Sequence, residues 1–225
     1  MNAKSNRPLG RPRLSNVDSG KDPKRAILDA AAKLFATQGF AGTSTREIAA
    51  AVGLRQPSLF HYFASKETIL DGIIEELLRP SLVAFDRLSA SPGEAEVDLY
   101  AAVWADALQV AKMPDAARAL IRTPELRSER FKALRESRDR LLAFYAAVIN
   151  RGQSDGVLVG GSPQVLSHLT ASLVESVGDP TFEPTDPEHY ADAVANYAVR
   201  GLLSRPTELA AIRRRALDLV AVTAQ

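Results

Sequence analysis

The chain has 225 residues, no cysteine and a formal net charge of +1. This length suits one large domain, or a small domain joined to a medium one. Without cysteine there are no disulfides and no thiolate metal sites, which favours a reducing cytoplasm. No stretch reaches the roughly 18 apolar residues that a membrane-spanning helix needs. Residues 1–14 are polar and basic, and they lack the apolar stretch of a secretory signal.

The charge is unevenly distributed along the chain. Residues 1–66 carry 11 Lys and Arg against 4 Asp and Glu, whereas the remainder carries 17 against 23. This asymmetry favours a polyanionic partner for the first part, although a disordered basic tail without a partner explains the composition equally well. Residues 1–21 are rich in Pro, Gly, Ser and basic residues and show no apolar period. We expect them to form a flexible basic arm.

Three short helices are predicted after the arm. Asp22 and Pro23 form an N-cap and a first helical residue, and the apolar residues that follow recur with helical spacing until Gly39. Ser44 and Glu47 have the spacing of a capping box that begins a second helix, which Gly53 ends. A third helix is expected over about residues 56–63.

The rest of the chain is also predicted to be helical. A fourth helix begins after Ser65 and is expected to end or kink at Pro80. Further helices are expected near residues 94–113, 115–122, 125–151, 164–177, 187–203 and 207–222. Only residues 157–159 have any strand character. The sequence therefore predicts an all-α protein. Its N-terminal three-helix helix-turn-helix domain spans residues 22–66, and a larger C-terminal helical bundle spans residues 67–225.

The third helix has the features of a DNA-reading helix. Leu59 and Phe63 share one face and are expected to anchor it in the core. The outward positions are then Pro57, Ser58 and His61, with Gln56 at the N-terminal tip. Gln can form two hydrogen bonds with adenine, one through the oxygen and one through the nitrogen of its side-chain amide. Ser can donate or accept a hydrogen bond, and Pro can contact a thymine methyl group.

The stretch over residues 22–70 resembles the tetracycline-repressor-like (TetR) family of bacterial regulators. The matching motifs are Ile27–Ala31 with Leu34, Phe35, Gly39 and Phe40, then Thr43–Ala49, Val52–Leu54, Ser58–Phe63 and Ser65–Glu67. The resemblance implies a cytoplasmic homodimer, without enzyme activity, that binds an inverted-repeat operator in double-stranded DNA. It also implies a repressor that releases the operator when a small-molecule effector binds the C-terminal domain. Phe60 departs from the tyrosine that is frequent in the family.

The predicted DNA contacts cover both short helices and the arm. Thr45 and Lys66 are expected on phosphates, and the complete set is Arg11, Arg13, Thr45, Arg46, Arg55, Gln56, Pro57, Ser58, Phe60, His61, Tyr62 and Lys66. Arg11 and Arg13 either enter a minor groove or belong to a solvated tail. His61 lies far from the other two histidines, which favours a base or phosphate contact over a metal site.

An effector cavity is expected among the helices of the C-terminal domain. Its predicted lining is Trp104, Leu108, Phe131, Arg138, Leu141, Tyr145 and His168. Arg138 falls on the apolar face of its helix, so its partner is either an internal acid or an acidic group of the effector. Trp104 is either a core residue or a wall of the cavity. No cofactor or metal site is expected.

The helices at about 164–177 and 187–203 are expected to form the dimer interface. The candidate contacts are Tyr190, Val194, Tyr197 and Ala198. Two other classes of protein are less consistent with the sequence. An enzyme is disfavoured because the chain lacks the common nucleophile, phosphate-binding, dinucleotide-binding and zinc-protease motifs. A helical adaptor protein would not need a basic reading domain.

Overall fold

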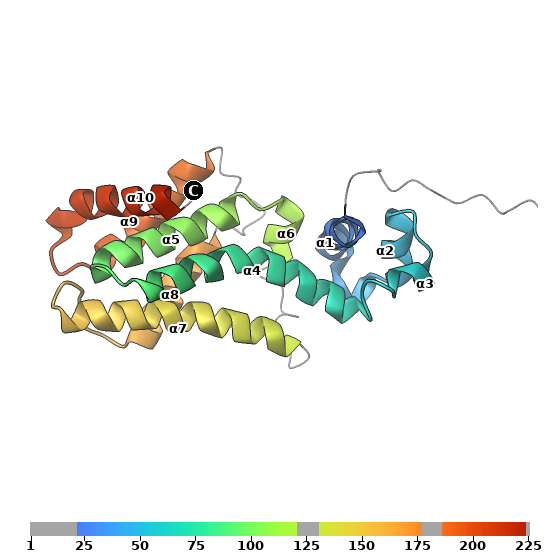
Figure 1. Cartoon of the computed structure of the whole chain (residues 1–225), viewed down its shortest axis with the longest axis horizontal. Coiled ribbons are helices and arrows are strands. Elements are labelled where there is room, and N and C mark those ends of the chain that lie inside the picture. The colour runs from blue at the N-terminus through green and yellow to red at the C-terminus, as the bar shows by residue number, and fades with distance from the viewer. Residues whose placement is uncertain (1–21, 121–130, 177–185, 224–225) are drawn as a thin grey trace, which may run out of the picture.

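The computed structural model describes residues 22–120, 131–176 and 186–223. In these ranges the chain folds into helices and short connections, and the extended segments meet only in an isolated bridge between Leu158 and Leu203. The predicted all-α fold, with an N-terminal helix-turn-helix and a larger helical C-terminal domain, is confirmed. The N-terminal helix-turn-helix domain, called the reader from here on, lies at one end of an elongated bundle (Figure 1).

The helix-turn-helix domain consists of α1 (Pro23–Gly42), α2 (Thr45–Ala51) and α3 (Gln56–Leu59). The carboxylate of Asp22 caps α1 by accepting from the amide of Lys24 at 3.0 Å. Ser44 and Glu47 form both bonds of the predicted capping box at the start of α2. Gly53, with a φ of +69°, makes the tight turn between α2 and α3. The local signals for these three features were correct. Gly39, the predicted end of the first helix, interrupts it with a φ of +76°, but α1 continues to Gly42.

The third helix is shorter than predicted, because α3 ends at Leu59. The amides of His61 and Tyr62 donate to carbonyls three residues earlier, at Ser58 and Leu59, in a tightened turn. Aromatic residues and histidine have modest helix propensity, and residues 60–63 consist only of these. The expected continuation of the helix to Phe63 is therefore wrong.

The bundle begins with α4 (Lys66–Ala90), α5 (Ala95–Ala111), α6 (Asp115–Leu120) and α7 (Lys132–Ser154). It continues with α8 (Pro163–Glu175), α9 (Pro187–Leu202), a 3₁₀ turn (Pro206–Glu208) and α10 (Leu209–Thr223). The expected end of α4 at Pro80 is wrong, since the helix continues to Ala90. Pro80 is exposed, so its ring projects into solvent instead of disturbing the core.

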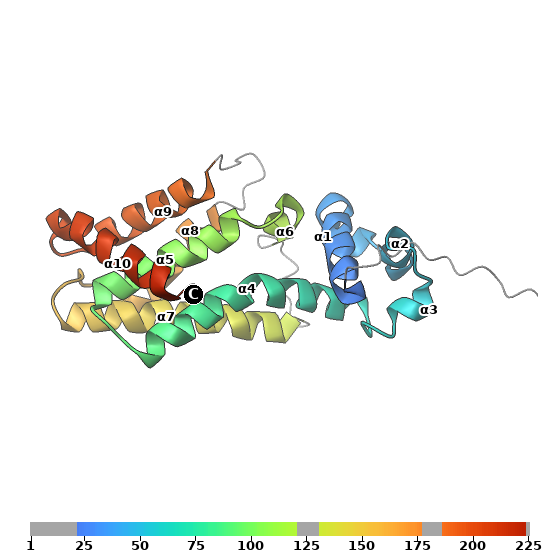
Figure 2. The same cartoon turned by 45° about the horizontal axis from the view of Figure 1, so that its top comes forward.

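Helix α5 forms the centre of the bundle. It packs against α4, α7, α8, α9 and α10, and every residue from Ala95 to Val103 is buried. A helix that is buried on all sides is typical of such a central position. Figure 2 shows the neighbouring helices arranged around it.

The reader and the bundle share a packed junction. Helix α1 contacts both α4 and α6, which lie beside it in Figures 1 and 2. Gly72 of α4 permits a close approach, because a Cβ there would lie 3.2 Å from a methyl carbon of Leu28. The rings of Phe40 and Phe131 meet edge to face, with centroids 5.6 Å apart. A movement in the bundle can therefore be transmitted to the reader through direct contacts.

Candidate functional site

The residues predicted to read DNA form an exposed surface at the tip of the reader. Leu59 is fully buried and anchors the segment, and Ser58 is half-buried beside it. The remaining predicted readers, with the two basic residues of α2 and of the turn, are exposed: Arg46, Arg55, Gln56, Pro57, Phe60, His61 and Tyr62. Phe60 and Tyr62 stay 44% and 37% exposed although they are large apolar groups. Packing within the chain does not account for this exposure.

A hydrogen bond joins the first residues of α2 and α3. The amide nitrogen of Gln56 donates to the hydroxyl of Thr45 at 2.8 Å. This bond occupies one donor of the Gln56 amide and leaves its carbonyl oxygen outside the bond. It holds the side chain of Gln56 against the side chain of Thr45.

Lys66 has a structural role that the sequence analysis did not predict. Its ammonium donates to the carbonyls of Phe40 and Thr43, at 2.6 Å and 2.8 Å, and lies 4.4 Å from the centre of the Phe40 ring. These contacts hold the end of α1 against the start of α4. Two of its donors face the protein, and the expected phosphate contact of Lys66 stays a prediction. Arg11 and Arg13 lie outside the described residues.

A small cavity of about 40 Å³ lies between α4, α5, α7 and α8. Its lining consists of Leu77, Leu78, Asp106, Val110, Met113, Arg138, Leu141, Leu142, Tyr145, Ala171, Val174 and Glu175. The sequence-based set includes three of these residues, namely Arg138, Leu141 and Tyr145.

Four predicted lining residues lie elsewhere. Trp104 and Leu108 are half-buried residues of α5 that pack against the core. Phe131 is buried against Phe40 at the junction with the reader. His168 is exposed on α8. The apolar period of a helix indicates which residues are buried but not which neighbouring helix they face. These four residues do not line this cavity, and their contact with an effector stays a prediction.

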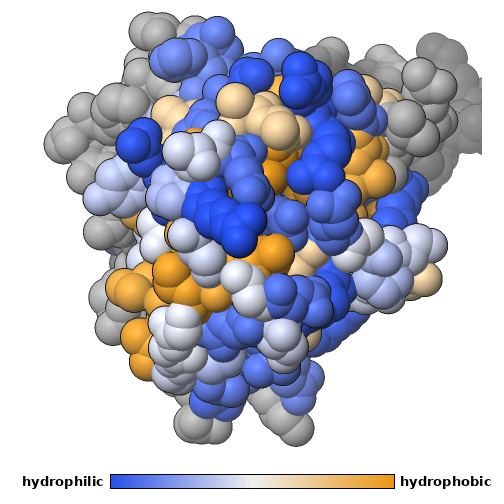
Figure 3. All heavy atoms as spheres, turned by 90° about the vertical axis from the view of Figure 1, so that its left-hand side faces the viewer, coloured by the Kyte–Doolittle hydropathy of each residue, from blue (hydrophilic) through white to orange (hydrophobic). Residues whose placement is uncertain are grey.

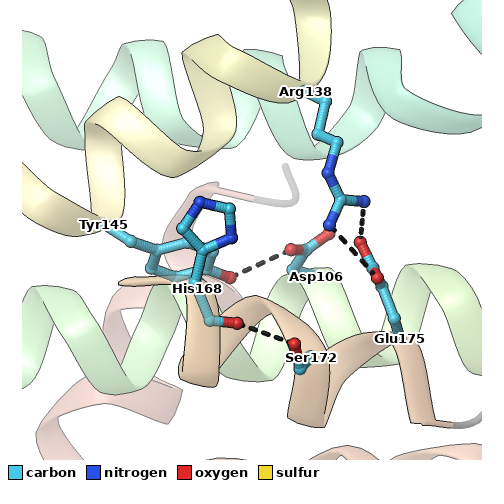
Figure 4. A network of polar contacts seen from close by, with 6 residues as sticks. All are labelled: Asp106, Arg138, Tyr145, His168, Ser172 and Glu175. Atoms are coloured by element: carbon cyan, nitrogen blue, oxygen red, sulfur yellow. Dashed lines mark hydrogen bonds and ion pairs between the residues drawn. The ribbon is translucent and has the colours of Figure 1, made fainter. Parts of the chain in front are cut away.

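Asp106 is the principal polar group of the cavity, and the sequence analysis missed it. It is buried and accepts from Ser81 of α4 at 2.6 Å and from Tyr145 of α7 at 2.9 Å. Figure 4 shows the Tyr145 contact beside the pair of Arg138 and Glu175. Burial raises the pKa of Asp106, the two hydrogen bonds lower it, and the charge of Glu175 raises it further. A single acid in an apolar stretch of helix was the signal that could have revealed it.

Arg138 is paired with an internal acid. Its guanidinium donates to both carboxylate oxygens of Glu175 on α8, and its side chain is 41% exposed at the edge of the cavity. Of the two partners left open by the sequence, the structure therefore supplies the internal one. This pairing neutralises Arg138 and removes the reason to expect an acidic effector.

The predicted dimer residues lie on two faces of α9. Val194 and Ala198 are buried, on the face that packs against α5, so they are not available to a partner and this part of the prediction is wrong. Tyr190 is half-buried, and its hydroxyl contacts that of Ser176 at 2.8 Å. Tyr197 is 73% exposed, because it lies about 100° around the helix from Ala198.

Comparisons with known proteins agree with this architecture. The family pattern described as bacterial regulatory proteins, tetR family, matches residues 27–73. The chain is 32% identical over 146 residues to the HTH-type transcriptional repressor KstR2 of Rhodococcus jostii, covering 61% of this chain and 69% of that protein. The crystal structure of Mycobacterium smegmatis AmtR superposes with a TM-score of 0.73 at 34% identity. That match covers 88% of this chain and 96% of AmtR.

AibR shares the fold at a lower sequence identity than AmtR. Its crystal structure in complex with isovaleryl coenzyme A and operator DNA superposes with a TM-score of 0.67 at 21% identity, covering 78% of this chain and 97% of AibR.

The chain belongs to the TetR family of bacterial regulatory proteins. It is a DNA-binding transcription regulator whose reader is the helix-turn-helix domain. None of the described helices is long and apolar enough to cross a membrane.

Proposed function

We propose that this protein is a cytoplasmic homodimeric repressor that releases an inverted-repeat operator when a small molecule enters the cavity beside Asp106. It acts by binding and catalyses no reaction. Two similar proteins support this proposal. KstR2 is a transcriptional repressor, and AibR forms a complex with isovaleryl coenzyme A and operator DNA.

The observation that carries the proposal is the path of α4. Its first residue, Lys66, holds the end of α1, while Leu77 and Leu78 line the cavity. One turn further on, Ser81 donates to Asp106. The same helix therefore contacts the reader and the ligand site, so a ligand that displaces α4 changes the placement of the reader. A coupling free energy of about 1–3 kcal/mol changes affinity roughly 5- to 150-fold.

The size of the cavity indicates how the switch works. A volume of about 40 Å³ has room for little more than water, whereas sites for drug-sized ligands have about 300–1,000 Å³. A ligand must therefore separate α4 from α7 and α8. Such a ligand binds the opened conformation better than the closed one, which is the condition for shifting the equilibrium between them.

Exposed apolar residues of α8 and α9 provide the dimer surface. Val165 and Leu169 on α8 are 57% and 58% exposed, and Tyr197 on α9 is exposed as well. His168 shares the face of Val165 and Leu169 by helical spacing. The end of the bundle away from the reader has only separate apolar areas among hydrophilic side chains (Figure 3), so we place the partner along α8 and α9.

The reader contacts DNA through its exposed tip. Gln56, Pro57, Ser58, His61 and Tyr62 contact base edges, and Phe60 packs beside them. Thr45, Arg46 and Arg55 contact phosphates, and Arg11 and Arg13 of the arm add affinity. The two readers of the dimer bind half-sites whose centres lie about 34–36 Å apart, or a multiple of this.

The test begins with selection of bound duplexes from a random library by the full-length protein. We expect an inverted repeat, and affinity for it that falls steeply with salt concentration. Enrichment of no sequence, or binding that does not respond to salt, contradicts the proposal. The selected duplex then serves as the reporter for release in a screen of small molecules.

A further inference from the structure

The cavity contains a buried carboxylate, that of Asp106, which has no basic partner among the described residues. Asp106 is 7% exposed, and among the described residues no Lys, Arg or His lies within 4 Å of its carboxylate. Its two hydrogen-bond donors are the neutral hydroxyls of Ser81 and Tyr145. An ionised carboxylate offers about four acceptor positions, so about two remain unused. A buried charge of this kind is costly until a cation compensates it.

The rest of the lining does not supply that cation. Among the described residues of the lining, Arg138 is the only basic one, and its guanidinium is engaged by both carboxylate oxygens of Glu175. With Asp106 ionised, the lining therefore has two negative charges and one positive charge. The remaining nine residues are apolar except for the hydroxyl of Tyr145, which favours a mostly hydrocarbon ligand.

We propose that the effector is an organic cation, with an amine on an apolar skeleton, and that its ammonium group binds Asp106. This inference rests on the proposed function and specifies the ligand of the same site. The ammonium donates to the free lone pairs of the carboxylate, while the skeleton lies against the leucines of α4 and α7. The carboxylate discriminates against acids by charge repulsion and against neutral alcohols by the weaker bond that they form.

The placement of Asp106 links recognition to the switch. The same carboxylate that binds the ammonium accepts from Ser81, the residue directly after Pro80 in α4. A cation that draws Asp106 toward itself competes with this bond and loosens α4 beside the cavity.

The test uses three probes with one skeleton, namely 4-phenylbutylamine, 4-phenylbutanol and 4-phenylbutyrate. Trp104 is the single tryptophan and lies two residues before Asp106, so its fluorescence reports binding to full-length protein. Thermal unfolding gives an independent readout. We expect the amine to bind about 10- to 150-fold more tightly than the alcohol, as for a hydrogen bond to a charged group, and the acid to bind most weakly.

Two variants test whether Asp106 causes the preference for the amine over the alcohol. Asp106→Asn has nearly the same shape and should bind the amine and the alcohol equally. Asp98→Asn is the matched control, since Asp98 is also a buried acid of α5 but pairs with Arg151 outside the cavity. It should keep the preference for the amine.

Three results overturn the inference: the acid binding as tightly as the amine, Asp106→Asn keeping the amine preference, or no probe binding. Tighter binding of the acid leaves the cavity as the effector site and rejects only the ligand class. Failure of operator selection rejects the proposed function without affecting the ranking of the probes.

Discussion

Replacing Lys66 by Met tests whether this residue supports the fold or contacts DNA. Methionine keeps the apolar stem but loses the two bonds to the carbonyls of Phe40 and Thr43 and the contact with the Phe40 ring. Hydrogen bonds to charged groups contribute about 1.5–3 kcal/mol each. Because Lys66 is only half-buried, we expect a total loss of about 2–4 kcal/mol. For a chain of this size, that lowers the Tm by about 4–16 °C.

The loss of stability is measured by urea and thermal unfolding, with circular dichroism as the signal. Lys33→Met is the matched control, since Lys33 is an exposed residue of α1 and its replacement should change stability by less than about 0.5 kcal/mol. The reasoning is refuted if Lys66→Met keeps full stability but weakens binding to all DNA sequences. In that case the slope of log affinity against log salt concentration should also be shallower by about 1. That result would show that Lys66 contacts a DNA phosphate.

Three further predictions concern the dimer, the buried acid and the arm. The double variant Leu169→Glu and Tyr197→Glu should sediment as a 24.3 kDa monomer, and a persisting dimer would place the interface elsewhere. The raised pKa of Asp106 means that its contribution to stability is present at low pH and is lost as pH rises through that pKa. Wild type should therefore lose stability relative to Asp106→Asn between pH 4.5 and pH 8, whereas a constant difference contradicts this sign. Deleting residues 1–20, which removes four cations and one acid, should weaken DNA binding and flatten its salt slope. An unchanged slope would show that the arm does not contact DNA.

The starts of α1 and α2 and the turn before α3 could be predicted because their causes are local. The Asp22 cap, the Ser44 capping box and the Gly53 turn depend on residues within a few positions of each other. The end of α3 was missed because the aromatic segment keeps Phe63 near the core through a turn instead of a regular helix. Periodicity alone does not distinguish the two.

The lining of the cavity beside Asp106 could be predicted only in part because it depends on how helices meet. The period of α7 identified Leu141 and Tyr145 as buried, and both line the cavity. The partner of Arg138 lies 37 residues further along the chain, and no local pattern connects them. The same limit explains Val194, which was predicted to contact a partner subunit but packs against α5 within the chain.

The most direct test of the account measures base discrimination by the tip of the reader. Fluorescence anisotropy gives the affinity of full-length protein for the selected operator and for the same duplex with its half-sites scrambled. We predict that Gln56→Ala reduces the difference between the two by about 1–3 kcal/mol, and that adding Ser58→Ala reduces it further. An operator preference that survives both substitutions unchanged contradicts the assignment of this surface as the DNA reader.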